Sequence, residues 1–255
     1  MFAFFKKEWI MEERFGKTFM EKTKFQNLDT SDQMKGLPSP ALEWGIVPDQ
    51  KKIDLPKPES LSLPDIGLRT AIDKRQSIRQ YSTVPITREE LSFLLWCTQG
   101  VKQVFPDSVS IRTVPSAGAR HALETYILVN RVKKLDPGLY RFLAIDHKLV
   151  QINRTADIAE HVTSACLGQY FVMECAAVFI WIAVISRMTW RYGERGYRYI
   201  FLDAGHVCQN LYLSAEALGC GVCAIGAFSD DELNSILKLD GEQQFVIYLA
   251  TVGKQ

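Results

Sequence analysis

The sequence has almost no net charge and no long hydrophobic run. Its 30 Lys and Arg residues nearly balance 29 Asp and Glu residues, which leaves a net charge of +1. This balance argues against a general nucleic-acid-binding surface, and 47% hydrophobic residues argue against disorder. The best candidate for a membrane span, residues 176–185, is much shorter than the ~20 apolar residues that a spanning helix needs. We therefore expect neither nucleic acid nor a membrane among its partners.

Signals for secretion and for several catalytic folds are also missing. Residues 1–7 place their lysines after the apolar residues, and glutamates follow soon, which makes a poor signal peptide. The six cysteines are therefore expected to be reduced thiols of a cytoplasmic protein. The sequence has no G-x-S-x-G elbow, P-loop or G-x-G-x-x-G fingerprint, which argues against a serine hydrolase and against those nucleotide-binding folds.

One group of cysteine and histidine residues raises the question of a metal site. Cys220 and Cys223 have C-x-x-C spacing, and His206 and Cys208 precede them. On a helix, His206 and Cys208 point about 160° apart, so one ion cannot bind both. Redox pairs of this spacing usually begin a helix, whereas this pair follows a helix end. We expect no metal and no dithiol chemistry.

Proline divides the chain into two unequal parts. Six prolines exclude regular helix over residues 38–64: Pro38, Pro40, Pro48, Pro56, Pro58 and Pro64. The preceding residues 4–25 are amphipathic and charged. We interpret residues 1–65 as an N-terminal arm, an amphipathic helix plus an extended segment, and residues 66–255 as one domain. Two domains divided near residue 66 are the less favoured alternative, because residues 1–65 have too few apolar positions for a core.

Periodicity predicts helices and strands in a mixed order after the arm. Helices are predicted at residues 66–74, 91–99, 155–174, 199–218 and 230–237, and strands at 124–130, 138–142, 147–152, 176–185, 222–228 and 244–252. Thr87 and Glu90 have the spacing of a capping box, and a loop is predicted from residue 101 to 119. The uninterrupted apolar run at 176–185 indicates a strand covered on both faces. The combination predicts an α+β fold of three layers, with a sheet between helices.

The helix predicted at residues 199–218 carries two unusual stripes. Its core stripe is apolar and consists of Ala204, Val207, Cys208, Leu211, Ala215 and Leu218. Its second stripe has small or hydrogen-bonding residues where an exposed helix would have Lys and Glu, namely Asp203, His206, Asn210, Ser214 and Ala217. We expect a central helix packed on several sides, with Gly219 as its left-handed C′ residue. A buried helix that binds nothing is the alternative.

Three further segments could contact a ligand. Arg75, Ser77 and Arg79 place a hydroxyl between two guanidinium groups, a donor set that suits phosphate, although a solvated basic surface is the alternative. The small residues 115–119 let a backbone approach a ligand closely, or form an ordinary loop. Residues 190–199 alternate aromatic and arginine residues, which suits stacking on single-stranded nucleic acid. Overall neutrality favours a packed entry to the helix instead.

Taken in this order, the segments resemble the FMN-dependent nitroreductase family, and in particular its SagB-type branch, which includes thiazole- and oxazole-forming dehydrogenases. The resemblance covers about residues 60–253. The matching segments are residues 75–81, 94–100, 115–119, 137–140, 192–199, 203–210, 224–228 and 252–253. The resemblance implies a nitroreductase-like α-β-α fold with a mostly antiparallel sheet. It also implies an intertwined homodimer with two FMN molecules at the subunit interface.

The resemblance further implies which residues contact FMN. Arg75 and Ser77, within the segment that includes Gln76, would bind the phosphate with help from Lys254, and Arg79 would lie near the ribityl chain. Gln169 would face the pyrimidine edge. The neighbouring subunit would contribute Pro115, Ser116, Ala117 and Ala119. The segment that passes atoms N5 and O4 of the flavin ring would consist of Ile225, Gly226 and Ala227.

The chemistry implied by the resemblance is ping-pong hydride transfer. NADH or NADPH would reduce the flavin at N5, and a small electrophile such as a nitroaromatic or a quinone would then take the electrons. The alternative is a SagB-type azoline or peptide dehydrogenase that uses FMN as the oxidant. Its Lys-Tyr pair would correspond to Arg191 and Tyr192 here, but arginine is a poor base. A flavin-binding or partner-binding module without catalysis is a third possibility.

Two departures from the family pattern concern contacts across the dimer. Ala119 stands where the familiar members carry a polar residue, so one flavin contact is expected to be lost. The sequence has only two residues after Gly253, where many relatives continue into an extension that embraces the partner. Our hypothesis is that the N-terminal arm takes over part of that function.

Overall fold

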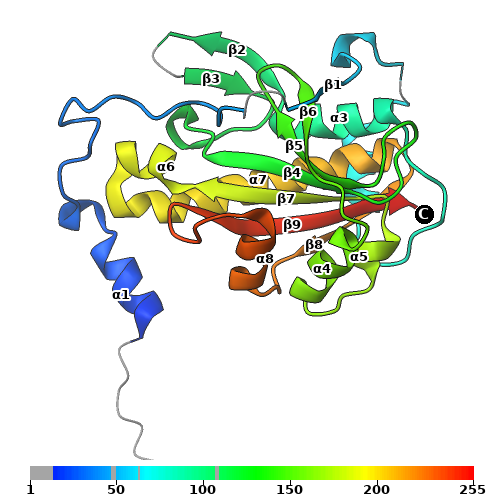
Figure 1. Cartoon of the computed structure of the whole chain (residues 1–255). Coiled ribbons are helices and arrows are strands. Elements are labelled where there is room, and N and C mark those ends of the chain that lie inside the picture. Colours follow the sequence, from blue (N-terminus) through cyan, green and yellow to red (C-terminus); the bar gives the residue numbers. More distant parts are fainter. Residues whose placement is uncertain (1–13, 47–49, 63, 107–108) are drawn as a thin grey trace, which may run out of the picture.

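A computed structural model describes residues 14–46, 50–62, 64–106 and 109–255, and a seven-stranded sheet lies at its centre (Figure 1). The strand order is β1-β6-β5-β4-β7-β9-β8, and all neighbouring strands are antiparallel. The strands are Lys52–Asp54 (β1), Leu123–Val129 (β4), Gly138–Leu143 (β5), Lys148–Asn153 (β6), Ala177–Val184 (β7), Cys220–Ile225 (β8) and Gln244–Lys254 (β9). All of β7 is buried, as the apolar run predicts.

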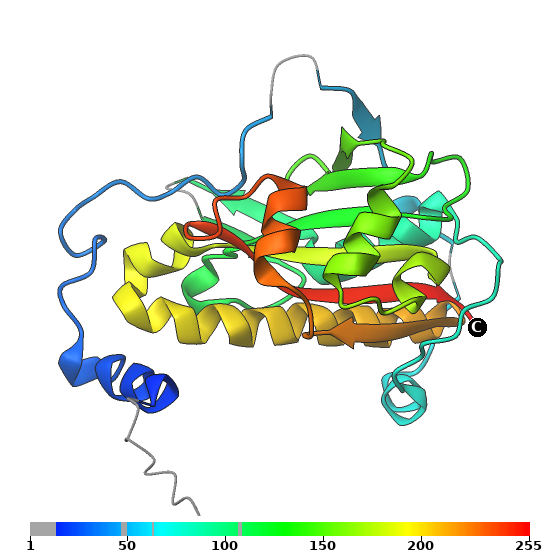
Figure 2. The same ribbon diagram turned by 60° about the horizontal axis from the view of Figure 1, so that its bottom comes forward.

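Helices cover both faces of this sheet. One face carries α3 (Arg88–Gln99) and α7 (Gly196–Ala217), and the other carries α4 (Ile158–Ala165), α5 (Phe171–Glu174) and α8 (Asp230–Leu237). Figure 2 turns the second of these layers toward the viewer. Alternate residues of β7 supply the two cores, with Phe179 on the α7 side and Ile180 on the α4 side. The predicted three-layer α+β fold is confirmed.

Helix α7 runs along the sheet as the predicted central helix. It has 22 residues, which corresponds to a length of ~33 Å at 1.5 Å per residue. All six members of the predicted core stripe are buried. Gly219 follows the helix with φ of +58°, the left-handed conformation expected for C′. The second stripe is less uniform than predicted, because Asp203 is buried while His206 is exposed.

Helices α3 and α8 differ in how their N-termini are capped. Before α3, Glu90 N donates to Thr87 Oγ1 at 3.1 Å and Thr87 N donates to Glu90 Oε2 at 2.8 Å, so the capping box is complete. Helix α2 spans Leu68–Lys74, close to its prediction. Ser229 does occupy the N-cap of α8, but its side chain makes no capping hydrogen bond.

The single helix predicted over residues 155–174 is wrong. Two separate helices, α4 and α5, occupy this segment. Between them Leu167 has φ of +58° and Gly168 has φ of +70°, and two consecutive left-handed residues cannot continue an α-helix. The glycine permits the turn without steric cost.

The loop predicted from residue 101 contains a hairpin instead. Strands β2 (Val101–Phe105) and β3 (Val109–Arg112) pair antiparallel as a separate two-stranded sheet. Polar residues occupy part of both strands and β2 is largely exposed, so the alternation that identifies a half-buried strand is weak. Residues 190–199 are also more regular than predicted, since they contain the end of helix α6 (Ile185–Tyr192), a short 3-10 turn and the start of α7.

The described part of the N-terminal arm lies against the body after α1 (Phe15–Lys22), which projects from it (Figure 1). The chain then passes through a short 3-10 helix (Phe25–Asn27) and a turn to the end of α6, where Trp190 Nε1 donates to Leu37 O at 2.9 Å. Further along, β1 pairs with β6 at the sheet edge. The first part of the predicted amphipathic segment, residues 4–13, lies outside the described residues. No helix among the described residues is long and apolar enough to cross a membrane.

Candidate active site

The segment that follows α2 is fixed against strand β8. Ile78 N donates to Val222 O at 2.9 Å, and Ser77 forms an isolated parallel bridge with the same residue. Gly221 makes this approach possible, because a Cβ there would lie 2.5 Å from Ile78 Cβ. Ser77 Oγ also lies 2.9 Å from Tyr212 Oη on α7. The hydroxyl between the two predicted phosphate-binding arginines is therefore held in place.

The arginines of this segment retain their capacity to bind an anion. Arg75 Cζ lies 5.4 Å from the ring centroid of Tyr212, and neither Arg75 nor Arg79 forms an ion pair with a described carboxylate. Gln76 is exposed between them. A hollow of about 560 Å³ opens beside the segment, lined by residues 77–82, Tyr170 and Gln255. Unpaired guanidinium groups next to a hollow fit a phosphate-bearing ligand.

Gln169 connects the turn after α4 with the end of β8. Its Nε2 donates to Cys166 O and to Ala227 O, each at 2.8 Å. Ile225 is buried, whereas Gly226 and Ala227 are exposed. Two predicted flavin contacts, Gln169 and residues 225–227, thus lie side by side. Together with residues 75–79 they form what we term the first half-site.

Lys254 is placed differently from the other candidate phosphate ligands. Its Nζ lies 2.6 Å from Glu90 Oε1 and donates to Leu218 O at 2.6 Å. Both acceptors satisfy the ammonium group at the carboxyl-terminal end of α7. Its role as a phosphate ligand stays a prediction, and it would require the ion pair with Glu90 to open.

The turn at residues 115–119 is anchored by a carboxylate of α7. Ser116 Oγ donates to Asp203 Oδ2 at 2.6 Å, and Ala117 N donates to Asp203 Oδ1 at 3.2 Å. Ser116 Oγ in turn accepts from His121 N at 2.9 Å. Burial raises the pKa of Asp203, while the hydrogen bond from Ser116 opposes that rise. Sequence reasoning placed Asp203 on α7 but missed this anchoring role.

The same turn packs on Arg191 and Tyr192 at the end of α6. Gly118 has φ of +57°, and a Cβ there would lie 2.5 Å from Tyr192 Oη and 2.9 Å from Arg191 Cδ. Ala119 is also left-handed, with φ of +53°, and Pro115 is exposed. The predicted proton-transfer pair and the predicted flavin-binding turn therefore touch. We term residues 115–119, Arg191 and Tyr192 the second half-site.

The two half-sites contact α7 at different points along its length in one chain. The first contacts α7 at Tyr212 and the second at Asp203, nine residues apart, which corresponds to ~14 Å along the axis. In Figure 1 the end of α6 and the α4–α5 region likewise lie at opposite sides of the sheet. A single chain does not bring the predicted flavin contacts into one cleft.

The cysteines offer no reactive pair near these half-sites. Cys220 faces the α7 core and Cys223 the α4 core, because residues three apart in a strand point to opposite faces. Burial raises the pKa of both thiols, that of Cys220 to about 11. In the part of the chain that the structure describes, no three His, Cys, Asp or Glu side chains gather as metal ligands do.

The order of these segments matches a known family. The model of the Nitroreductase family covers residues 72–254. This chain belongs to the nitroreductase family. As a member, it is an oxidoreductase.

Individual relatives agree with this assignment. The chain is 36% identical over 207 residues to a proposed nitroreductase of Methanocaldococcus jannaschii, which covers 81% of this chain and 98% of the relative. The solved structure of a proposed nitroreductase from Anabaena variabilis superposes with a TM-score of 0.66 at 33% identity, over 81% of this chain and 42% of that one.

A third relative has a name of a different kind. The trifolitoxin-processing protein TfxB of Rhizobium leguminosarum bv. trifolii is 26% identical over 194 residues, which covers 74% of this chain and 46% of TfxB. The present chain thus spans nearly the whole M. jannaschii protein, but less than half of the A. variabilis protein and less than half of TfxB.

Proposed function

We propose that the protein is an FMN-dependent oxidoreductase that holds its flavin between two copies of the chain. The observation that supports this proposal is the separation of the two half-sites along α7. Each half-site consists of residues for which the family resemblance implies flavin contact, yet one chain keeps them apart. A second copy, placed so that its second half-site faces the first half-site of its partner, completes a flavin site.

The donor set of the first half-site suits FMN. Arg75 and Ser77 supply a guanidinium fork and a hydroxyl for the terminal phosphate, and Arg79 supplies a second cation near the ring. Gln169 uses its amide nitrogen internally, and its Oε1 accepts no hydrogen bond from a described residue. This oxygen is available to accept from an N–H of a flavin pyrimidine edge.

Exposed apolar side chains on α7 support contact with a second copy of the chain. Phe201 and Leu202 are both exposed, and α2 adds exposed Leu68 and Ile72. Gly205 lies on the same side of α7, and a Cβ there would meet no atom of the chain within 4 Å. Apolar residues that gather on one face of a helix, with a small residue among them, are typical of a contact with another protein surface.

The chemistry that FMN supplies when bound is two-electron hydride transfer at N5, between NADH or NADPH and a small electrophile such as a nitroaromatic or quinone. The chain's residues bind and orient the reactants. Arg191 contributes the positive charge of a guanidinium group beside the cleft. Tyr192, held against residues 115–119, limits the space over the reacting face. No acid or base side chain is required for this transfer.

An azoline or peptide dehydrogenase is the second candidate, favoured by the similarity to TfxB. Such a reaction removes a proton as well as a hydride from the substrate, so it needs a base near the flavin. Tyr192 is the available group, since Arg191 cannot serve as the base. Oxidation of an azoline peptide without NADH or NADPH would favour this candidate.

The absorption spectrum of the freshly purified protein tests the proposal. We expect visible flavin absorbance that NADH or NADPH bleaches without oxygen, and a nitroaromatic or quinone restores. The variant Arg75→Ala/Ser77→Ala should lose the flavin. Arg69→Ala is the matched control, because Arg69 is an exposed guanidinium on the adjacent helix α2 whose ion-pair partner is the exposed Asp73 of the same helix. A colourless protein that cannot be reconstituted with FMN would contradict the proposal.

A further inference from the structure

Helix α1 has an apolar face that the described part of the chain leaves exposed. Phe15 is 82% exposed, and Phe19, Met20 and Phe25 are exposed as well. None of the eight residues of α1 is buried. Isolated helices of fewer than about 12 residues are marginal in water, so a helix of this length requires a packing partner.

The described contacts that hold α1 to the body lie toward its carboxyl-terminal end. Arg195 Nη1 donates to Thr23 O and Arg198 Nε donates to Thr23 Oγ1, each at 2.7 Å. The same arginines lie over aromatic rings, Arg195 over Phe25 at 4.3 Å and Arg198 over Phe19 at 5.9 Å. Arg195 and Arg198 follow Tyr192 closely in the chain. Helix α1 therefore projects from the side of the molecule that carries the second half-site.

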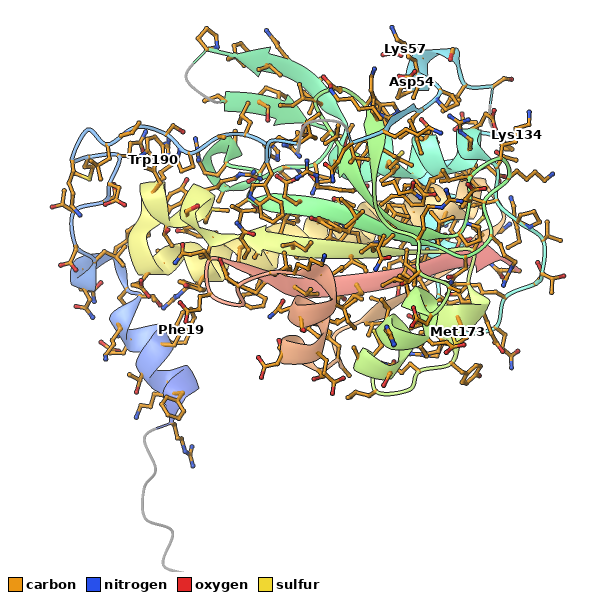
Figure 3. The ribbon with its side chains drawn as sticks, in the orientation of Figure 1. Phe19, Asp54, Lys57, Lys134, Met173 and Trp190 are labelled. Carbon is orange, nitrogen blue, oxygen red and sulfur yellow. The ribbon has the colours of Figure 1, made fainter. Side chains whose placement is uncertain are left out.

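A second uncovered apolar surface borders the first half-site. Leu167, Tyr170 and Met173 are 64%, 57% and 42% exposed on the α4–α5 turn, which we term the α4–α5 rim. Gln169 of the first half-site lies within this rim, and Tyr170 lines the hollow beside residues 77–82. In Figure 3, Phe19 and Met173 lie at opposite ends of the molecule, so the helix cannot cover the rim of its own chain.

The two surfaces carry opposite charges. Residues 14–25, which comprise α1 and its described flanks, contain four cations, Arg14, Lys17, Lys22 and Lys24, against one carboxylate, Glu21; Glu12 and Glu13 precede this segment in the sequence. The helices around the rim contain exposed acidic residues, namely Glu160, Glu174, Asp230, Asp231 and Glu232. Helix α8, which contributes the last three, packs on α4. Such complementarity favours association of the two surfaces.

We propose that α1 of one copy packs across the α4–α5 rim of its partner and walls one side of the partner's flavin cleft. This inference rests on the proposed function, in which the second half-site of one copy meets the first half-site of the other. That arrangement also brings together what adjoins each half-site, namely α1 on one copy and the rim on the other. The occupant of the rim is thus a second copy of this chain.

The placement has a consequence for the substrate. Phe15, Phe19 and Met20 of one chain and Tyr170 of the other line the entrance that an electron acceptor uses. An aromatic, uncharged acceptor fits this wall, because aromatic faces and a flexible thioether pack well against a planar ring.

Cross-linking between engineered cysteines tests the inference. The variant Phe19→Cys/Met173→Cys is treated with a short bis-maleimide, and covalent dimers are counted on a denaturing gel. Both sites are exposed, and the native thiols are buried except for the half-buried Cys97. We expect most of the chain to form covalent dimers, and few dimers from either single variant. Phe19→Cys/Ile145→Cys is the matched control, since Ile145 is as exposed as Met173 but lies on a different turn.

Light scattering and flavin content of the same preparation distinguish a wrong placement of α1 from a wrong proposed function. A flavin-containing dimer that gives no more cross-link than the Ile145 control would overturn the placement of α1 and leave the proposed function standing. A monomer without flavin would overturn the proposed function, and the inference would fall with it. Efficient cross-linking in a flavin-containing dimer supports both.

Discussion

Asp203 on α7 accepts a 2.6 Å hydrogen bond from Ser116, which comes 87 residues earlier in the chain. The same carboxylate accepts from Ala117 N, so one buried side chain holds the whole turn at residues 115–119. The position of this turn also determines the space left for Tyr192. Asp203 is therefore a positioning residue for the second half-site.

Replacing Asp203 should release the turn. We expect Asp203→Ala to lower the free energy of unfolding by about 1–3 kcal/mol, because two half-buried donors lose their acceptor. Asp203→Asn keeps one acceptor oxygen and should lose less. Flavin affinity, measured by titration with FMN, should follow the same order. Equal flavin affinity in the wild type and both variants would show that the turn does not need this anchor.

The contact between Gly118 and Tyr192 allows a test by compensation. A Cβ at Gly118 would lie 2.5 Å from Tyr192 Oη, so Gly118→Ala should displace the tyrosine and lower kcat/KM several-fold. Tyr192→Phe removes the clashing oxygen. The double variant should therefore recover part of the activity lost in Gly118→Ala. Gly36→Ala is the control for an alanine at a left-handed position, since Gly36 has φ of +76° and a Cβ there would meet no described atom within 4 Å. Strictly additive losses would argue against a direct contact.

His121 gives a prediction for pH. Burial, with the charges of Arg112 and Arg120, lowers the pKa of this histidine from its ordinary 6.5 to about 3. Between these values the unfolded chain binds a proton that the folded chain does not, so the folded state loses stability as pH falls. The slope should be about 1.4 kcal/mol per pH unit.

The variant His121→Asn isolates this contribution. Asparagine tolerates the left-handed backbone of residue 121, whose φ is +44°. Urea unfolding at several pH values should give a shallower loss of stability with acid for the variant than for the wild type. Parallel curves would mean that His121 does not carry the predicted pKa shift.

A buried ion pair fastens the arm to the body. Arg187 Nη2 donates to Glu124 Oε1 at 2.6 Å, and both side chains are almost fully buried. Arg187 Nε also donates to Ala41 O, and Glu124 accepts from Trp44 N, so each partner also binds the arm.

Breaking this pair should destabilise the protein and loosen the arm. Arg187→Met leaves Glu124 charged and unpaired, which should cost about 3–5 kcal/mol of unfolding free energy. The double variant Arg187→Met/Glu124→Gln should cost less than the two single changes combined. Limited proteolysis should cut residues 28–46 faster in Arg187→Met. An unchanged cleavage rate would show that the pair does not hold the arm.

Long elements with a clear period could be predicted from the sequence. Strand β7 is apolar throughout and helix α7 repeats its core stripe over several turns, so burial and secondary structure coincide there. The hairpin of β2 and β3 was missed because β2 is largely exposed, while β3 buries the polar Ser110 and Arg112 and exposes Ile111, the reverse of the expected alternation. The break between α4 and α5 was missed because Leu167, a good helix former, adopts the left-handed C′ conformation, with Gly168 N donating to Thr163 O at 3.0 Å.

The candidate site could be predicted only in part. Local signals indicated Arg75, Ser77 and the turn at residues 115–119 as candidates, because their chemistry is visible in a few adjacent residues, and their contact with a flavin stays a prediction. The anchoring by Asp203 depends on residues far apart in the chain. One feature of the sequence could have suggested this anchoring. Asp203 stands on a helix face of small residues, and a carboxylate that is buried there requires a polar partner.

Mixed dimers test the central claim, that each flavin site uses both copies, most directly. One chain carries Arg75→Ala/Ser77→Ala, which damages the first half-site, and the other carries Gly118→Trp, which damages the second. A mixed dimer, isolated with two different tags, then has one site with both lesions and one intact site. We predict one FMN per mixed dimer and none in either parent dimer. Mixed dimers without flavin, prepared beside a wild type that binds it, would contradict the account.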